Sequence, residues 1–95
     1  MAIKNDQGKD RWDLLQWKAI QDVVKVASYG SVKYGDNNWK QDGGLSAARL
    51  FAATMRHINA WQKGEVVDTG SGLSHLAHAA WNMLAILELD LPAPK

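Results

Sequence analysis

Apolar residues recur at three- and four-residue intervals in three segments of the chain, which is the spacing of a helix buried on one face. The first segment predicts a helix that begins near Leu14 or Trp17 and ends between Tyr29 and Tyr34. Valine also suits strands, but no run competes well with the helical pattern. Segment 34–44 is rich in Gly, Asn and Asp, so we expect a loop there. The apolar stripe of the first predicted helix consists of Trp17, Ile20, Val23, Val24 and Ala27.

The second predicted helix has signals at both ends. Ser46 is a suitable N-cap for a helix over 47–63, because its hydroxyl can accept a hydrogen bond from a free backbone amide. Gly64 follows at the position where a left-handed C-cap residue is common. The apolar stripe of this helix consists of Ala47, Leu50, Phe51, Thr54, Ile58 and Trp61.

The third predicted helix follows a short connection. Either Thr69 or Ser71 is expected to cap it, and it ends near Leu89, shortly before two prolines. Its apolar stripe consists of Leu73, Leu76, Ala77, Ala80, Leu84 and Leu87.

Three such helices in 95 residues predict a single all-α domain over 1–95, with an irregular leading segment over 1–12. The composition, 46% hydrophobic with five Trp, is that of a folded chain. Small helical chains commonly bury more apolar surface by association, so we also expect a homo-oligomer.

Cysteine content and charge exclude several classes of protein. The sequence has no cysteine, which rules out disulfides and thiolate metal sites and favours a reducing cytoplasm. No apolar run is long enough for a membrane span, and the N-terminal residues lack the core of a signal peptide. The formal net charge of +1 argues against binding of bulk nucleic acid, although a local cluster of charge suffices for a small anion.

The third helix carries a polar stripe of Ser71, His75, His78 and Asn82, separate from its leucines. Two imidazoles three residues apart can share a metal ion or donate to phosphate oxygens. The alternative is a polar or partly buried face whose histidines are simply hydrogen-bonded.

The second helix is cationic, because no Asp or Glu occurs between Gly43 and Gly64. Arg49, Arg56 and Lys63 share one stripe with small alanines, which suits a grip on phosphate oxygens. A solvated basic face, or a close helix contact through the alanines, is the alternative.

Two further groups lie in the connections. Glu65 and Asp68 can bind a divalent cation or activate a water, although Asp68 can also act on the dipole of the third helix. Asn38 and Trp39 suit recognition of a base, since an amide reads its edge and an indole stacks on its face. A turn with an anchoring Trp is the alternative.

Four fragments occur together, in the order G-K-D-R-W-D-L-L, Y-G-S-V-K-Y-G-D-N-N-W, R-H-I-N-A-W-Q-K-G-E-V-V-D and S-G-L-S-H-L-A-H-A-A-W-N. With these fragments the chain resembles the phage dATP/dGTP diphosphohydrolase family, N-terminal domain type, from about Asp6 to Leu87. The resemblance implies an all-α phage protein, in the host cytoplasm, that hydrolyses purine deoxynucleoside triphosphates to monophosphate and pyrophosphate. It also implies a divalent cation, Mg²⁺ or Mn²⁺, and a link to MazG-like pyrophosphohydrolases, which assemble as dimers or tetramers.

The residue patterns and the resemblance together give a set of candidates for an enzyme site. The catalytic candidates are Glu65, Asp68 and His57. The metal-binding candidates are His75, His78 and Asp68. The ligand-binding candidates are Arg56, Arg49, Lys63, Asn38, Trp39, Tyr34, Ser71 and Asn82.

One departure from the MazG-like pattern keeps a second function open. Those enzymes hold Mg²⁺ with paired acids, spaced E-E-x-x-E on one helix and E-x-x-D on the next, whereas here the second helix has no acid and the third has none before Glu88. Either the family uses a mixed histidine and carboxylate site, or this chain binds a nucleotide without cleaving it and needs no metal. In the latter case it traps a nucleotide, or a cyclic nucleotide signal of host defence. A structural helical oligomer with polar surface stripes is the third option.

Overall fold

The computed structural model describes residues 7–40 and 44–91, which form three α-helices and two short 3₁₀ turns. The described elements are η1 Trp12–Leu14, α1 Trp17–Tyr34, η2 Asn38–Lys40, α2 Ala47–Gln62 and α3 His75–Asp90. Within these ranges there is no strand, and β pairing is limited to one isolated bridge between Val67 and Ser74. The predicted all-α class with three main helices is therefore confirmed. The homo-oligomer stays a prediction, and half of the expected irregular leading segment, residues 1–6, lies outside the described residues.

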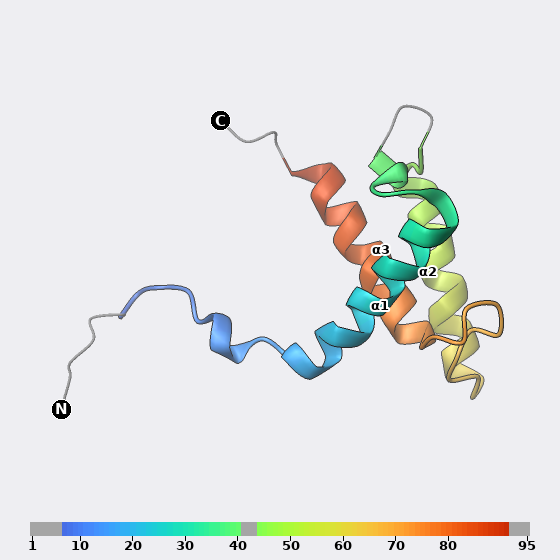
Figure 1. Ribbon diagram of the computed structural model, residues 1–95. Coiled ribbons are helices and arrows are strands. Elements are labelled where there is room, and N and C mark those ends of the chain that lie inside the picture. The colour runs from blue at the N-terminus through green and yellow to red at the C-terminus, as the bar shows by residue number, and fades with distance from the viewer. Residues whose placement is uncertain (1–6, 41–43, 92–95) are drawn as a thin grey trace.

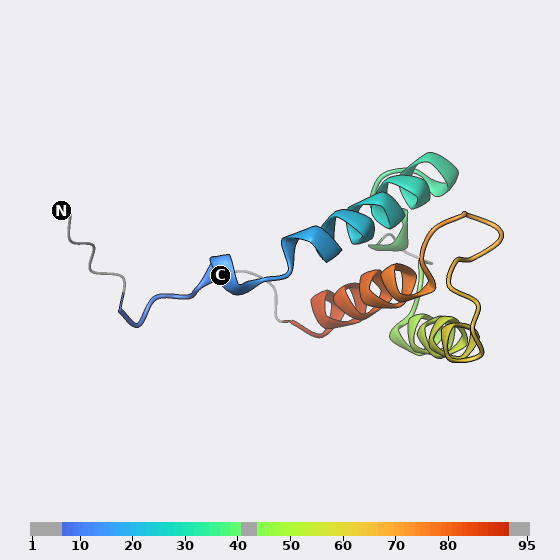
Figure 2. The same ribbon diagram turned by 90° about the horizontal axis from the view of Figure 1, so that it is seen from below.

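Helix α3 occupies the centre of the domain, because it packs against both α2 and α1. In Figure 1 the three helices lie together, whereas the segment that precedes α1 extends away from them. Figure 2 shows α1 running along α3, with α2 seen nearly end-on beside the N-terminal end of α3. The segment between α2 and α3 is thereby held close to both helices.

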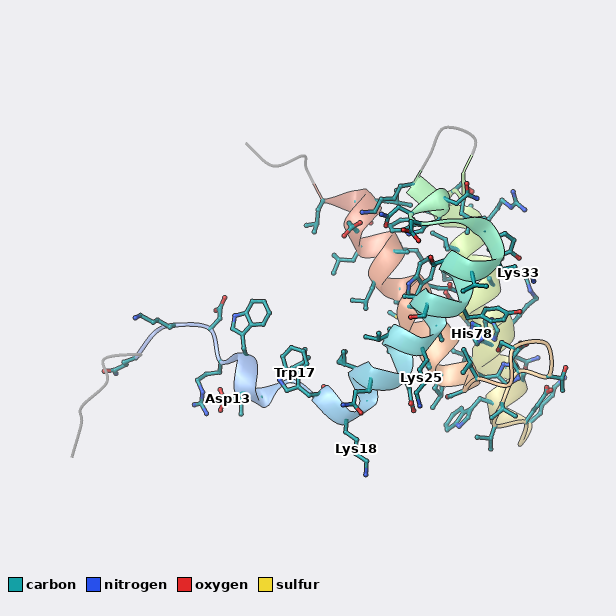
Figure 3. All side chains as sticks on the ribbon, viewed as in Figure 1. Asp13, Trp17, Lys18, Lys25, Lys33 and His78 are labelled. Atoms are coloured by element: carbon teal, nitrogen blue, oxygen red, sulfur yellow. The ribbon has the colours of Figure 1, made fainter. Side chains whose placement is uncertain are left out.

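The described part of the segment that precedes α1 carries exposed apolar side chains. Trp12 is 72% exposed, and the Trp17 Nε1 donates a hydrogen bond to the Trp12 carbonyl oxygen at 2.9 Å. Figure 3 shows Trp17, the first residue of α1, away from the packed part of the helices, and His78 within that part. None of the described helices is long and apolar enough to cross a lipid bilayer.

The core is built from small residues, contrary to the leucine stripe expected for α3. The leucines of that stripe, Leu76, Leu84 and Leu87, are about half exposed. Because α3 lies between two helices, small side chains on its contact faces allow close approach and leave the leucines on the remaining face. The side chains that α3 buries belong to His75, Ala77, Ala79, Asn82 and Ala85.

In helix α2, too, only part of the predicted apolar stripe is buried. Leu50 is 2% exposed and Thr54 is 4% exposed, and the Thr54 hydroxyl donates to the Leu50 carbonyl oxygen at 2.7 Å. Phe51, predicted to lie in the core, is instead 60% exposed. The apolar contact made by α2 is thus narrower than its sequence pattern indicates.

The predicted caps of α2 are confirmed, and the predicted cap of α3 is wrong. Ser46 accepts from the Arg49 amide at 3.2 Å, and Gly64 adopts a φ of +101°. At α3 the cap is Ser74, whose hydroxyl accepts from the backbone amides of the next turn. The expected alternatives, Thr69 and Ser71, lie in the preceding loop, because backbone pairing across it delays the start of the helix.

Changing Ser74 to Ala is expected to lower the free energy of unfolding by about 1 kcal/mol, because two backbone amides lose their acceptor. For a domain of this size that corresponds to a melting temperature lower by roughly 4–8 °C. Thermal melts followed by circular dichroism measure the shift. Thr69→Ala is the matched control, with an expected change within about 0.5 kcal/mol. Equal losses in both variants would show that Ser74 does not cap the helix.

Candidate functional site

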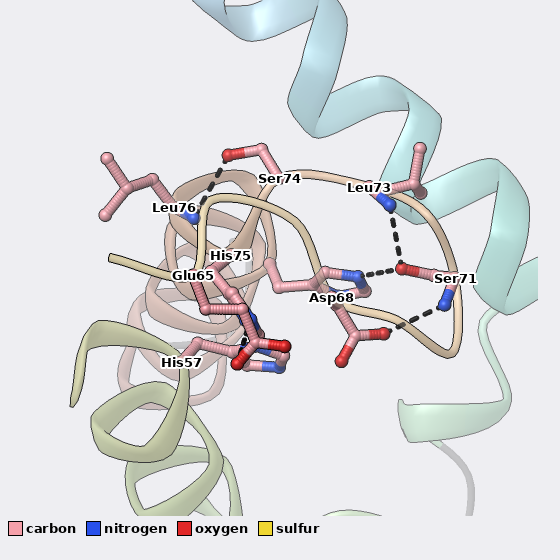
Figure 4. A network of polar contacts seen from close by, with 9 residues as sticks. His57, Glu65, Asp68, Ser71, Leu73, Ser74, His75 and Leu76 are labelled. Carbon is pink, nitrogen blue, oxygen red and sulfur yellow. Dashed lines mark hydrogen bonds and ion pairs between the residues drawn. The ribbon is translucent and has the colours of Figure 1, made fainter. Parts of the chain in front are cut away.

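The loop between α2 and α3 folds back and fixes the polar residues that it carries. The Asp68 amide donates to the Leu73 carbonyl oxygen at 2.8 Å, and the His75 amide donates to the Val66 carbonyl oxygen at 3.0 Å. These two bonds close the loop at the N-terminus of α3. Figure 4 shows the result, with Asp68 and Glu65 both beside the imidazoles of His57 and His75.

Three histidines from two helices meet beside this loop. His57 of α2 stacks on His78 of α3, with ring centroids 4.6 Å apart and planes 5° from parallel. His57 Nδ1 also lies 2.8 Å from His75 Nδ1, so one of these nitrogens carries a hydrogen and the other accepts it. The two histidines of α3 were expected on one stripe; the tertiary structure adds the third from α2.

Ser71 connects the acid of the loop to one of the imidazoles. Its backbone amide donates to Asp68 Oδ2 at 2.9 Å, and its Oγ lies 2.8 Å from His78 Nε2. Because Ser71 Oγ already accepts from the Leu73 amide at 3.1 Å, its own hydrogen is free to be donated to His78. Ser71 therefore positions Asp68 and His78.

The protonation states of the cluster follow from burial and hydrogen bonding. Burial lowers the pKa of His57, and the two neighbouring imidazoles lower it further. Burial also lowers the pKa of His78, against the opposing effect of Asp68. Burial acts to raise the pKa of Asp68, but hydrogen bonds from Ser71 and the nearby imidazoles outweigh it and lower that pKa. At pH 7 the site therefore holds two neutral imidazoles beside a carboxylate.

His75 is the most deeply buried member of the cluster, with 5% of its surface exposed. Its Nε2 has no hydrogen-bond partner among the described residues. The nearest acidic atom is Glu65 Oε2, at 3.4 Å. A buried ring nitrogen without a bonded partner is uncommon and calls for an explanation.

The donor set suits some metal ions better than others. One donor atom each from His57, Asp68 and His75 lie within 4.8 Å of one another, the single such group found in the described part of the chain. Magnesium prefers an octahedron of oxygen ligands, and this group offers two nitrogens and one carboxylate. The paired-acid magnesium cage of MazG-like enzymes therefore does not fit these residues.

A cavity of about 780 Å³ opens beside the cluster, a size typical of small-molecule sites. Its walls come from the second half of α1, the loop that follows, and the facing sides of α2 and α3. Lys33 and Arg49 give it positive charge, and His57 and Asp68 lie on its wall. The aromatic residues that line the cavity are Tyr29, Tyr34, Trp39 and Trp81.

The structure brings most of the sequence-predicted residues to this cavity. Those that line it are Arg49, Asn38, Trp39, Tyr34, Asn82, His57, His78 and Asp68. Three others, Ser71, Glu65 and His75, lie behind the cavity wall. Ser71 forms a hydrogen bond with His78, and Glu65 faces His75. The remaining two, Arg56 and Lys63, are exposed and do not line the cavity.

Among the residues that line the cavity, Tyr29, Lys33 and Trp81 were not candidates for the site, although all three lie in fragments that carry the family resemblance. Lys33 lies with its Nζ 5.1 Å from the Tyr34 ring centroid and 5.7 Å from that of Tyr29. Trp81 meets Trp39 edge to face, with ring centroids 5.5 Å apart. The four-residue spacing of Tyr29 and Lys33 on one face of α1 was an available signal. Trp81 had no such spacing signal, because its partner is distant in sequence.

Comparison with known proteins gives one family and one named relative. Residues 2–95 match the family model described as "dATP/dGTP diphosphohydrolase, N-terminal". The chain is 38% identical over 88 residues to a protein of Salmonella phage PMBT28 named dATP/dGTP diphosphohydrolase. That alignment covers 93% of this chain and 29% of the relative, so the chain spans less than a third of that protein. No solved structure is significantly similar to the chain.

Proposed function

The chain belongs to the dATP/dGTP diphosphohydrolase N-terminal family, and from this premise we propose that its cavity binds a purine deoxynucleoside triphosphate and hydrolyses it to monophosphate and pyrophosphate. The observation that carries the proposal is the composition of one cavity wall. Two cations, several aromatic rings and members of the histidine–aspartate cluster line the same cavity of about 780 Å³. Phosphates, a base and a reacting water need these three kinds of group.

Binding follows from the cavity lining. Lys33 and Arg49 neutralise phosphate charge, and the planar fork of Arg49 can contact two phosphate oxygens at once. Trp39 offers an aromatic surface for the purine, and the Asn38 amide has a donor and an acceptor for its edge. The named phage relative supports dATP and dGTP as the first substrates to examine.

The hydrolytic step needs a water oxygen at the α-phosphorus. As the new P–O bond forms, the bond from the α-phosphorus to the bridging oxygen breaks, and pyrophosphate leaves with the electron pair. The proton of the water passes to His57, which is neutral because burial lowers its pKa. Asp68, held by the Ser71 amide, orients that water. Charge neutralisation by the cavity cations assists the departure of pyrophosphate.

Retention without cleavage is the second candidate function, and the scarcity of carboxylates favours it. Among the described residues that line the cavity, only Asp36 and Asp68 are acidic. Asp36 accepts a hydrogen bond from Ser31 and is not part of the histidine cluster. The same aromatic and cationic lining would hold a nucleotide or a cyclic nucleotide intact.

One incubation separates the two functions. Purified protein is mixed with dATP or dGTP, with and without added divalent cation, and nucleotides are resolved by ion-exchange chromatography. We expect monophosphate and pyrophosphate in equal amounts, and at least about tenfold slower turnover in Asp68→Asn, since that change removes the negative charge of the cluster. Glu88→Gln, which alters an exposed acid paired with Lys40, is the control and keeps the wild-type rate.

The result that contradicts hydrolysis is equally direct. Intact nucleotide, recovered quantitatively from protein that binds it, leaves retention as the function. Protein that neither binds nor cleaves these nucleotides contradicts both candidates.

A further inference from the structure

We propose that His57, Asp68 and His75 form a site for a transition-metal ion of the Zn²⁺ type, in place of the Mg²⁺ cage of MazG-like enzymes. The inference rests on the proposed function and deepens it, because the site lies on the wall of the same cavity. With the ion bound, His57 would be a ligand, and the ion would activate the attacking water in place of the His57 imidazole. Two imidazoles and one carboxylate are the ligand set that zinc and its neighbours favour, whereas magnesium takes oxygen ligands.

The donor atoms are already close to the required separation. Two ligands of one zinc ion, each about 2.0–2.1 Å from it, lie roughly 3.4 Å apart in a tetrahedral site. His57 Nδ1 and His75 Nδ1 are 2.8 Å apart, so they separate by only about 0.6 Å to admit an ion between them. Since all donors of the group lie within 4.8 Å, no other pair has to approach by more than about 1.4 Å to reach that separation.

The buried nitrogen of His75 gives an independent sign of metal binding. If His75 binds through Nδ1, its ring hydrogen resides on Nε2, the atom that makes no hydrogen bond to any described residue. Glu65 Oε2 faces this atom at 3.4 Å and would accept that hydrogen after a small approach. A metal-bound histidine commonly donates its second N–H to a carboxylate in this way, which fixes the tautomer and the ring orientation.

The carboxylate ligand is fixed in a similar manner. The Ser71 amide donates to Asp68 Oδ2, which leaves the other carboxylate oxygen without that bond. Added bulk at Gly70 would meet Asp68 Oδ2 at 3.3 Å, so the loop backbone passes close to the carboxylate. These contacts hold Asp68 toward the two imidazoles.

The site would remain open on one side. His57 and Asp68 line the cavity, whereas His75 lies behind its wall. Three protein ligands with free coordination toward a cavity are typical of catalytic metal sites, in contrast to closed structural sites with four. Water or a phosphate oxygen of the proposed nucleotide would complete the coordination.

Metal binding is measured on the full chain, stripped of metal and without nucleotide. Co²⁺ titration followed by visible absorption reports coordination directly, and calorimetry compares Zn²⁺ with Mg²⁺. We expect one tightly bound Zn²⁺ or Co²⁺ per chain and no measurable heat with Mg²⁺. Glu65→Gln is expected to weaken Zn²⁺ binding about 10–100-fold. His57→Gln and Asp68→Asn, which remove ligands, are expected to weaken it further.

His78→Gln is the matched histidine control, because His78 bonds Ser71 and is absent from the donor group. It is expected to keep Zn²⁺ affinity, and thermal melts without metal verify that each variant folds. Wild-type affinity in His57→Gln and Asp68→Asn, or Mg²⁺ binding as tight as Zn²⁺, would overturn the proposal. Nucleotide binding by a chain that fails to bind Zn²⁺ would leave the proposed function intact. Zn²⁺ binding without nucleotide binding would reject only that function.

Discussion

Replacing Lys33 and Arg49 together with methionine is expected to weaken dATP binding about 100-fold or more. Each cation lines the cavity, and a hydrogen bond to a charged group contributes about 1.5–3 kcal/mol. Since about 1.4 kcal/mol corresponds to a tenfold change in the dissociation constant, two such contacts account for two or more orders of magnitude. Methionine keeps an unbranched apolar stem, so the cavity wall remains filled.

Isothermal titration calorimetry with dATP measures this effect, and a second cationic pair provides the control. Arg56 and Lys63 belong to the same basic helix face as Arg49 and are exposed like it, but they do not line the cavity. Changing both to methionine removes the same net charge and is expected to alter affinity less than about threefold, through screened long-range attraction. If this control loses as much affinity as the Lys33 and Arg49 variant, the nucleotide binds on the exposed face of α2 and the cavity is not its site.

Changing Leu50 to Ala is expected to lower the free energy of unfolding by about 2–5 kcal/mol, because it leaves a void at one of the most buried positions in the domain. A chain of this length has a total stability of only about 5–15 kcal/mol, so a large fraction is lost. The Leu50 backbone carbonyl oxygen still accepts the Thr54 hydrogen bond in this variant, so the loss reports on the side chain alone. Urea denaturation followed by circular dichroism gives the free energies.

The neighbouring residue provides the control. Phe51→Ala removes a larger side chain, but one that is 60% exposed, and is expected to change the free energy of unfolding by less than about 1 kcal/mol. A larger loss from Phe51→Ala than from Leu50→Ala would mean that the chain buries Phe51 in solution. That result would favour the expected homo-oligomer, and its dependence on protein concentration would identify it.

Local features of the fold were determined by the sequence alone. The periodicity of apolar residues located all three helices, and Ser46 and Gly64 marked the ends of α2 correctly. These features depend on neighbours within one turn of helix, so adjacent residues suffice to predict them. Ser74 escaped prediction because the start of α3 depends on pairing across the loop, which brings Val67 to Ser74.

The composition of the site required the tertiary structure. The sequence placed His75 and His78 on one helix face, but only the packing of α2 on α3 brings His57 against both of them. The same packing buries alanines of α3 and exposes its leucines, since hydrophobicity alone cannot indicate which face meets two neighbours. Likewise, the sequence shows that α2 carries a cationic stripe but does not show which part of the molecule that stripe faces. The fold turns Arg49 to the cavity and leaves Arg56 outside it, because the cavity wall is completed by α1, which is distant in sequence.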